Sequence, residues 1–184
     1  MNRDDGLRGD ARANRARILE VAREAFAAAP DASLNSIAKA AGVGPGTLYR
    51  HFPSREALLL GLYHKEIEDL AALAPKLAAA HAPVEAFRLW LDHVVDFGQM
   101  KHGIADALHA AMTERDFEQS YAPVVGAIDH LLSACVASGD FAPGPSAEDV
   151  LQLLAFIGRI EAGPEGKAQA KRLIALVVRG LTSR

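Results

Sequence analysis

Apolar residues recur at helical spacing along most of the chain. Ile18, Ala22, Ala25 and Phe26 fall at i, i+4, i+7 and i+8, so they lie on one face of a helix expected over residues 11–29. Proline, glycine and capping serines separate eight further helices, expected over residues 34–41, 45–52, 55–74, 83–99, 104–115, 123–137, 147–161 and 164–181. No segment shows convincing strand alternation. The pattern predicts an all-α protein of about nine helices.

The composition supports helices and a packed core. Alanine accounts for 36 of the 184 residues, and half of the chain is apolar. The formal charge of −3 excludes a globally basic nucleic-acid coat protein, but the charge is unevenly distributed. Residues 1–60 carry nine Lys and Arg against seven Asp and Glu, whereas residues 61–184 carry eleven against sixteen. This asymmetry indicates that only the first third meets an anionic partner.

The single cysteine and the short apolar runs limit the cellular setting. Cys135 alone cannot form a disulfide within the chain or a multi-cysteine zinc site, which fits a reducing compartment. No apolar run approaches the roughly 18 residues of a membrane-spanning helix. The charged start lacks the apolar stretch of a signal peptide. We therefore expect a cytoplasmic protein with no membrane-spanning segment.

The most informative segment runs from Ser33 to Phe52. Two short helices are joined there by a tight turn, in which Gly42 can take the positive φ that the turn needs. Ser33 is a good N-cap for the first helix, and Pro45 suits the first turn of the second. The apolar residues of both helices can point inward. This arrangement is typical of a helix-turn-helix, whose second helix enters the major groove of DNA.

The second short helix keeps polar and small residues on its outward face. Its hydroxyl, aromatic edge, guanidinium and imidazole suit contacts to phosphates and base edges. The alternative is an ordinary helical hairpin, with Tyr49 partly buried and with Lys39 and Arg50 merely solvated. The candidate DNA-binding residues are Ser33, Lys39, Pro45, Gly46, Thr47, Tyr49, Arg50, His51 and Arg55.

Residues 11–60 resemble the N-terminal domain of TetR-type transcriptional regulators. The resemblance is carried by Arg17-Ile18-Leu19, Ala25-Phe26, Ile37-Ala38, Ala41-Gly42-Val43, the run from Gly46 to Phe52, and Ser54-Arg55-Glu56 with Leu58. It implies that Thr47, Tyr49 and His51 face DNA. It also implies that Arg55, where the family usually has lysine, meets a phosphate. Gly44 departs from the family's common serine, which removes a possible cap and phosphate contact.

The resemblance also implies a division of the chain. Residues 1–9 are expected to form a mobile polar tail. A helix-turn-helix DNA-binding domain is expected over residues 10–55. A helical ligand-binding and dimerisation domain is expected over residues 56–184.

The second part of the chain is weakly similar to one TetR subgroup over residues 86–112. In the family this region forms a cavity for an inducer. Trp90, His93 and Phe97 combine aromatic and polar groups of the kind that orient a ligand in an apolar pocket, although such a stripe can equally be core. The candidate pocket residues are Phe87, Trp90, His93, Phe97, Met100, Met112, Phe117 and Tyr121. No histidine pair has the i, i+4 spacing of a helical metal site, so neither a metal nor a cofactor is expected.

The last two expected helices are apolar over more than half of their surface. A helix of this kind needs two neighbours, of which one is its own core. The resemblance implies that the other is the same pair of helices from a second copy. The candidate interface residues are Val150, Leu153, Leu154, Ile157, Leu173, Leu176, Val177 and Gly180.

The sequence therefore predicts a homodimeric DNA-binding regulator and not an enzyme. The most specific form of this prediction is a repressor that binds a palindromic operator and is released by a small hydrophobic or aromatic molecule. One alternative is a helical enzyme, but no Ser/His/Asp or Cys/His constellation has recognisable spacing and no glycine-rich phosphate loop follows a strand. Another is a regulator that acts through a protein partner.

Overall fold

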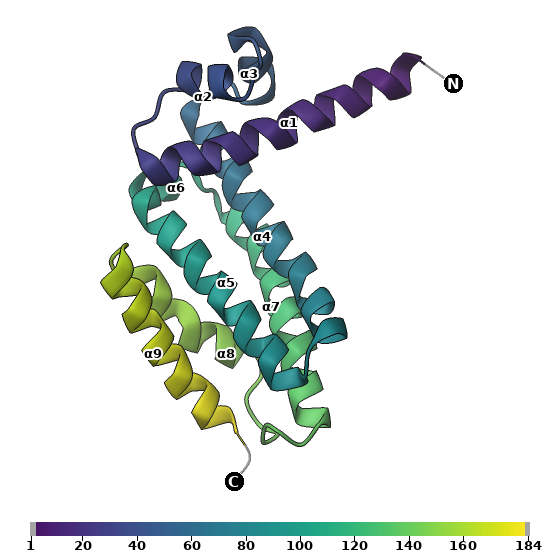
Figure 1. Ribbon diagram of the computed structural model, residues 1–184, viewed down its shortest axis with the longest axis vertical. Coiled ribbons are helices and arrows are strands. Elements are labelled where there is room, and N and C mark those ends of the chain that lie inside the picture. Colours follow the sequence, from purple (N-terminus) through teal and green to yellow (C-terminus); the bar gives the residue numbers. More distant parts are fainter. Residues whose placement is uncertain (1–2, 183–184) are drawn as a thin grey trace. The chain divides into compact units, whose positions relative to one another are not determined.

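A computed structural model describes the backbone of residues 3–182, and the side chains of residues 9–102 and 104–182. Within this range the chain forms nine α-helices and one short 3₁₀ helix (Figure 1). They are α1 (Arg3–Ala28), α2 (Leu34–Ala40), α3 (Pro45–His51), α4 (Arg55–Ala80), α5 (Pro83–Gly103), α6 (Ala105–Ala111), α7 (Glu114–Ala137), α8 (Ala147–Leu154), η1 (Ala155–Arg159) and α9 (Pro164–Leu181). A single isolated β-bridge joins Phe141 and Thr182. The predicted all-α class is confirmed.

Several helices extend further than their sequence signals indicate. Helix α1 begins at Arg3, so residues 3–9, expected to form a tail, are helical. Helix α4 continues through Pro75, and the predicted end at residue 74 is wrong. Helix α7 likewise continues through Pro123 and begins nine residues earlier, at a capping box in which the Thr113 N–H donates to Asp116 Oδ2 at 2.8 Å. Long helices thus tolerate an internal proline where capping and packing support both sides.

The chain divides into two compact units. One contains the residues up to Lys65 together with Gly103–Met112, and the other contains Glu66–His102 and Thr113–Arg184. The first unit differs in extent from the expected 10–55 domain, because it continues ten residues further and includes α6. Helix α4 begins in the first unit and ends in the second.

The first unit has its own core beneath the three N-terminal helices. Helix α1 contacts α2 and α3, and these two contact each other. Ile18, Ile37 and Leu48 supply one fully buried side chain from each of these helices. Gly61 of α4 lies so close to this core that a Cβ there would come within 2.6 Å of Phe52 Cε1. Burial of these apolar side chains fixes α2 and α3 against α1.

The second unit is a bundle of α5, α7, α8 and α9 with the second part of α4. Its core includes Phe87 and Trp90 of α5, together with Ile128 of α7 and Val150 of α8. The Phe87 ring meets the ring of Phe141 edge-on, at 5.5 Å between centroids. By length and composition α7 could cross a membrane, but this is weak evidence, and all but one of the buried residues of α7 belong to this core.

Candidate nucleic-acid interface

Local signals in the sequence determine the geometry of α2 and α3. The Ser36 N–H donates to Ser33 Oγ at 3.1 Å, which caps the start of α2. Gly42 has a φ of +64° in the turn, a conformation that side chains with a Cβ rarely adopt. Pro45 occupies the first turn of α3, as expected. The two short helices and their tight turn therefore form the predicted helix-turn-helix geometry.

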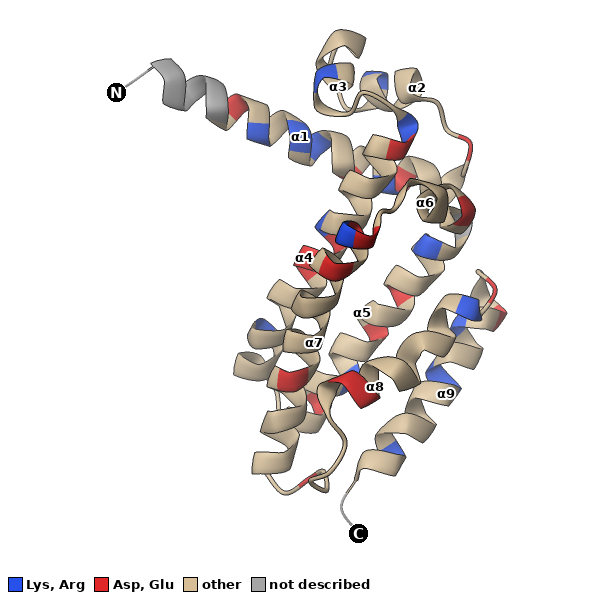
Figure 2. Ribbon diagram, turned by 180° about the vertical axis from the view of Figure 1, so that it is seen from behind, with Lys and Arg blue, Asp and Glu red and all other residues tan. Residues whose placement is uncertain are grey.

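Helix α3 has one buried face and one exposed face. Leu48 is fully buried, whereas 45% of the neighbouring Tyr49 surface is exposed. Pro45 and Gly46 are exposed beside Tyr49, and Thr47 and His51 are half-buried. The exposed face thus presents an aromatic side chain between small and polar residues. Figure 2 shows basic positions on α1, α2 and α3 of this unit.

The Arg50 side chain makes hydrogen bonds to residues of its own helix. Its Nε donates to the Gly46 carbonyl and one terminal nitrogen donates to Thr47 Oγ1, each at 3.1 Å. These two bonds hold the guanidinium along the exposed face of α3. Because Thr47 Oγ1 accepts from Arg50, its hydroxyl proton is still available to donate. Arg50 therefore orients Thr47, in addition to adding positive charge to this surface.

Arg55 has partners within the protein that the sequence did not indicate. One terminal nitrogen donates to the Ala32 carbonyl at 2.6 Å, and the other donates to the Pro30 carbonyl. The guanidinium lies over the Phe26 ring, 4.7 Å from its centroid. Arg55 thus joins the start of α4 to the segment between α1 and α2. The predicted phosphate contact is untested, and it would have to use the remaining N–H groups.

The other candidates on this unit lie at the surface. Lys39 is exposed near the end of α2, and the Ser33 hydroxyl accepts from the helix that it caps. Sequence reasoning missed Arg15 of α1, whose guanidinium lies 5.3 Å from the centroid of the Phe52 ring. The periodicity of α1 identifies its buried face but not the contacts of its charged residues. The roles of all nine candidate residues in DNA binding stay predictions.

The candidate pocket residues occupy several different environments. Phe87 and Trp90 are fully buried, His93 is exposed, and Phe97 and Met100 are half-buried. Trp90 donates its indole N–H to the Leu70 carbonyl at 2.9 Å. Phe117 and Tyr121 are each 46% exposed, and Met112 belongs to the first unit. Phe87 and Trp90 are therefore core residues of the second unit, and the ligand pocket stays a prediction.

The candidate interface residues are also divided. Val150, Leu154 and Ile157 are buried in the core of the second unit, so they are not on a surface that another copy can cover. Leu153 and Leu176, in contrast, are 52% and 55% exposed. Gly180 is exposed, and Leu173 and Val177 are half-buried. The outward part of the predicted stripe is therefore smaller than the sequence indicated.

The cysteine is buried and its thiol is held in the protonated form. Burial, with a smaller effect of the nearby Asp140 carboxylate, raises the pKa of Cys135 to about 11. A thiol is a poor nucleophile and a poor metal ligand until it is deprotonated. No group of three or more His, Cys, Asp or Glu residues that could hold a metal ion occurs in the described part of the chain.

Two family models match the chain. Residues 18–62 match the model of bacterial regulatory proteins of the TetR family. Residues 82–183, more than half of the chain, match the model of the C-terminal domain of SbtR-like transcriptional regulators. The first match contains both helices of the helix-turn-helix, and the second contains α5 to α9.

Individual relatives agree with these models. The transcriptional regulator UidR of Escherichia coli is 34% identical over 113 residues, which are 60% of this chain and 51% of UidR, so the match spans about half of the length of that relative. The crystal structure of a TetR transcriptional regulator from Streptomyces coelicolor is 37% identical, with a TM-score of 0.79 over 91% of this chain and 98% of that one. A TetR regulatory protein from Mycobacterium vanbaalenii is 29% identical, with a TM-score of 0.77 over 96% and 99%. The chain belongs to the TetR family of DNA-binding transcriptional regulators.

Proposed function

We propose that the protein is a homodimeric, cytoplasmic repressor that binds a palindromic operator and is released by a small hydrophobic or aromatic molecule. The first unit binds DNA, with residues 10–55 as its essential part. The helices within residues 56–184 supply the dimer contact and the ligand site. Because a two-fold axis relates the two recognition helices, the two half-sites of the operator are inverted repeats.

The observation that carries this proposal is the exposed face of α3. Tyr49 is 45% exposed, although tyrosine is a large residue that usually packs against a neighbour. Thr47 lies two residues before Tyr49 on the same helix, and its hydroxyl accepts a hydrogen bond from Arg50. An exposed aromatic ring and an oriented hydroxyl on one short helix are suited to the bases and phosphates of the major groove.

Surface leucines support the dimer. Leu153 and Leu176 expose more than half of their surface, and large apolar side chains gain stability when a second copy covers them. Dimerisation also supports operator binding, because two linked recognition helices bind more tightly than one. The proposed contact therefore uses Leu153, Leu176 and Gly180, with Leu173 and Val177 beside them.

The proposal is tested by selecting bound fragments from genomic DNA. The wild-type protein should enrich fragments that share an inverted repeat. Tyr49→Ala should lose this enrichment, while its melting temperature stays unchanged, because an exposed side chain contributes little to folding. Tyr121→Ala is the matched control, since it removes a tyrosine with 46% exposure from the other unit and should enrich the same fragments as the wild type. Equal enrichment by Tyr49→Ala would refute the role of α3, and fragments without a repeat would refute the two-fold symmetry.

A further inference from the structure

Residues 9–17 of α1 form a helical segment that contributes nothing to the core. None of these residues is buried, and Ile18 is the first residue of α1 whose side chain is buried. Figure 1 shows this part of α1 extending past α2 and α3. A short helical segment that buries no side chain is only marginally stable in water. A partner outside the chain would therefore stabilise this segment.

The segment is made of basic and small residues. Residues 11–17 read Ala-Arg-Ala-Asn-Arg-Ala-Arg, so they carry three positive charges and no carboxylate. Arg17 donates to the Asn14 side chain at 2.9 Å, and Arg15 lies over the ring of Phe52. In the described part of the chain, none of the three arginines pairs with a carboxylate. The charge of this segment is therefore available to an anionic partner.

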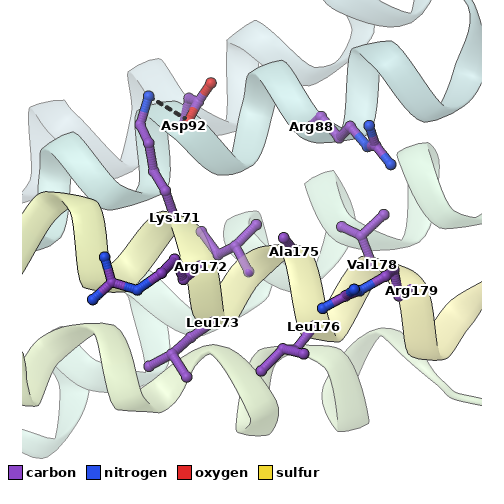
Figure 3. Close-up of a pocket in the computed structure, with 10 residues that line it drawn as sticks. Arg88, Asp92, Lys171, Arg172, Leu173, Ala175, Leu176, Val178 and Arg179 are labelled. Carbon is purple, nitrogen blue, oxygen red and sulfur yellow. Dashed lines mark ion pairs between the residues drawn. The ribbon is translucent and has the colours of Figure 1, made fainter.

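Basic residues of the second unit show the opposite arrangement. Figure 3 shows the groove beside α9, where Lys171 Nζ lies 3.2 Å from Asp92 Oδ1. Leu173 and Leu176 of the proposed dimer contact line the same groove. The ion pair joins α9 to α5, so the charge of Lys171 is used within the protein. The arginines of residues 11–17 have no such role.

Arg12 and Arg15 lie on the face of α1 that packs against the rest of its unit. Residues three or four apart share one face of a helix, so these two arginines continue the buried stripe that ends at Leu19. The Arg15 guanidinium lies 5.3 Å from the centroid of the Phe52 ring, and Phe52 is the residue that ends α3. The two arginines therefore follow the side of α1 that meets the C-terminal end of α3.

The dimensions of DNA decide what this face can meet. The major groove is about 12 Å wide, and a helix with its side chains is about 10–12 Å across, so the groove admits one helix. When α3 occupies the groove, a helix beside its end meets the sugar-phosphate backbone at the groove edge. Guanidinium groups form strong, charge-assisted hydrogen bonds with phosphate oxygens. The face that carries Arg12 and Arg15 is suited to this backbone.

We propose that Arg12 and Arg15 form a second DNA contact, which binds phosphates at the edge of the groove that α3 enters. Neither residue is among the nine candidates predicted from the sequence. The contact adds affinity for any sequence, whereas the exposed face of α3 supplies the sequence preference. Arg17 lies five residues after Arg12, so it points about 140° away and is not part of the contact. This inference rests on the proposed entry of α3 into the major groove.

The salt dependence of DNA binding by the full chain tests the proposal. The probes are a random-sequence duplex of about 30 base pairs and an inverted-repeat fragment from the genomic selection, each followed by fluorescence anisotropy. One phosphate contact contributes about 0.9 to the slope of log affinity against log salt concentration. Arg12→Gln should therefore lower the slope by about one on both probes, and the double variant with Arg15→Gln by about two. Arg12→Lys should keep the wild-type slope, because an ammonium also binds phosphate.

Arg17→Gln is the matched control, since it removes an exposed arginine from another face of the same segment. A helix diameter of about 10 Å is comparable to the Debye length at ordinary salt, so this variant should keep the wild-type slope. Arg12→Gln should keep the wild-type melting temperature, because the Arg12 side chain is exposed. An unchanged slope in Arg12→Gln and in the double variant would overturn the proposal, and so would an equal decrease in Arg17→Gln.

The two proposals fail in different ways. A wild-type protein that enriches no inverted repeat contradicts the proposed function, and the random-sequence duplex still tests the arginines. A wild-type protein that enriches an inverted repeat, together with a double variant whose salt slope is unchanged, contradicts only the contact by α1.

Discussion

Replacing Trp90 by alanine distinguishes a core residue from the wall of a ligand pocket. The side chain is fully buried in the second unit, and its indole N–H donates to the Leu70 carbonyl at 2.9 Å. A pocket wall can be truncated with little effect on folding when the cavity already exists. A core residue cannot, because truncation leaves a void and removes a hydrogen bond.

The structure gives the expected magnitude. Truncation of a fully buried tryptophan to alanine lowers the free energy of unfolding by about 3–5 kcal/mol, through lost burial and the cavity left behind. The Leu70 carbonyl also loses its partner, which by itself costs about 1 kcal/mol within that total. At about 2–4 °C per kcal/mol for a chain of this size, the melting temperature of Trp90→Ala should fall by roughly 6–20 °C.

Circular dichroism during thermal and urea unfolding measures this effect, because the variant has no tryptophan fluorescence to follow. Tyr121→Ala is the control, since that residue was predicted for the same pocket but is 46% exposed. Its free energy of unfolding should stay within about 0.5 kcal/mol of the wild-type value. An unchanged melting temperature for Trp90→Ala would refute the core assignment and restore the pocket interpretation.

Three further predictions follow from the contacts described above. Leu176→Glu should convert the dimer to monomers in sedimentation experiments without loss of helical signal, because a carboxylate would be buried unpaired only in the dimer; an intact dimer would refute the proposed contact. Arg55→Gln should lower the free energy of unfolding by about 1–3 kcal/mol, since two loop carbonyls lose a charged donor; unchanged stability with a salt slope for DNA binding reduced by about one would instead identify a phosphate contact. The raised pKa of the Cys135 thiol, about 11, means that the folded state holds this proton more tightly than the unfolded state. The corresponding stability should be complete below the unfolded pKa and lost as the pH rises toward 11, a decrease that Cys135→Ala should not show in urea titrations.

The helix-turn-helix could be predicted because its signals are local. Ser33 caps, Gly42 turns and Pro45 starts a helix through interactions within a few residues, so the sequence alone specifies them. The prolines at 75 and 123 are equally local signals, but the helix end predicted at Pro75 and the helix start predicted at Pro123 are both wrong. Packing of a long helix outweighs the loss of one hydrogen bond at an internal proline. Local rules therefore predict short elements better than the ends of long ones.

The pocket and the interface could not be predicted from periodicity. Leu153 and Leu154 are adjacent and equally apolar, but one is 52% exposed and the other 4%. Consecutive helical residues point about 100° apart, so a wide apolar stripe contains both the inward and the outward face. Only the positions of the neighbouring helices decide which leucine is covered. The same limit applies to Trp90, since core and cavity walls use the same residues.

Arg55 shows that a charged residue can hold the protein's own backbone in addition to the role that the family resemblance implies for it. The lysine that the family resemblance implies at this position would carry a compact ammonium at the end of a flexible chain, and such a group can reach a phosphate as a point charge. The arginine of this chain has a planar fork, and two of its arms bind the carbonyls of Pro30 and Ala32 while its face covers the Phe26 ring. Only the remaining N–H groups of the five can meet DNA. Arg55 thus carries the positive charge, but its guanidinium also holds the segment that leads into α2. A residue that the sequence identifies by its charge alone is in this protein also part of the scaffold that positions the recognition helix.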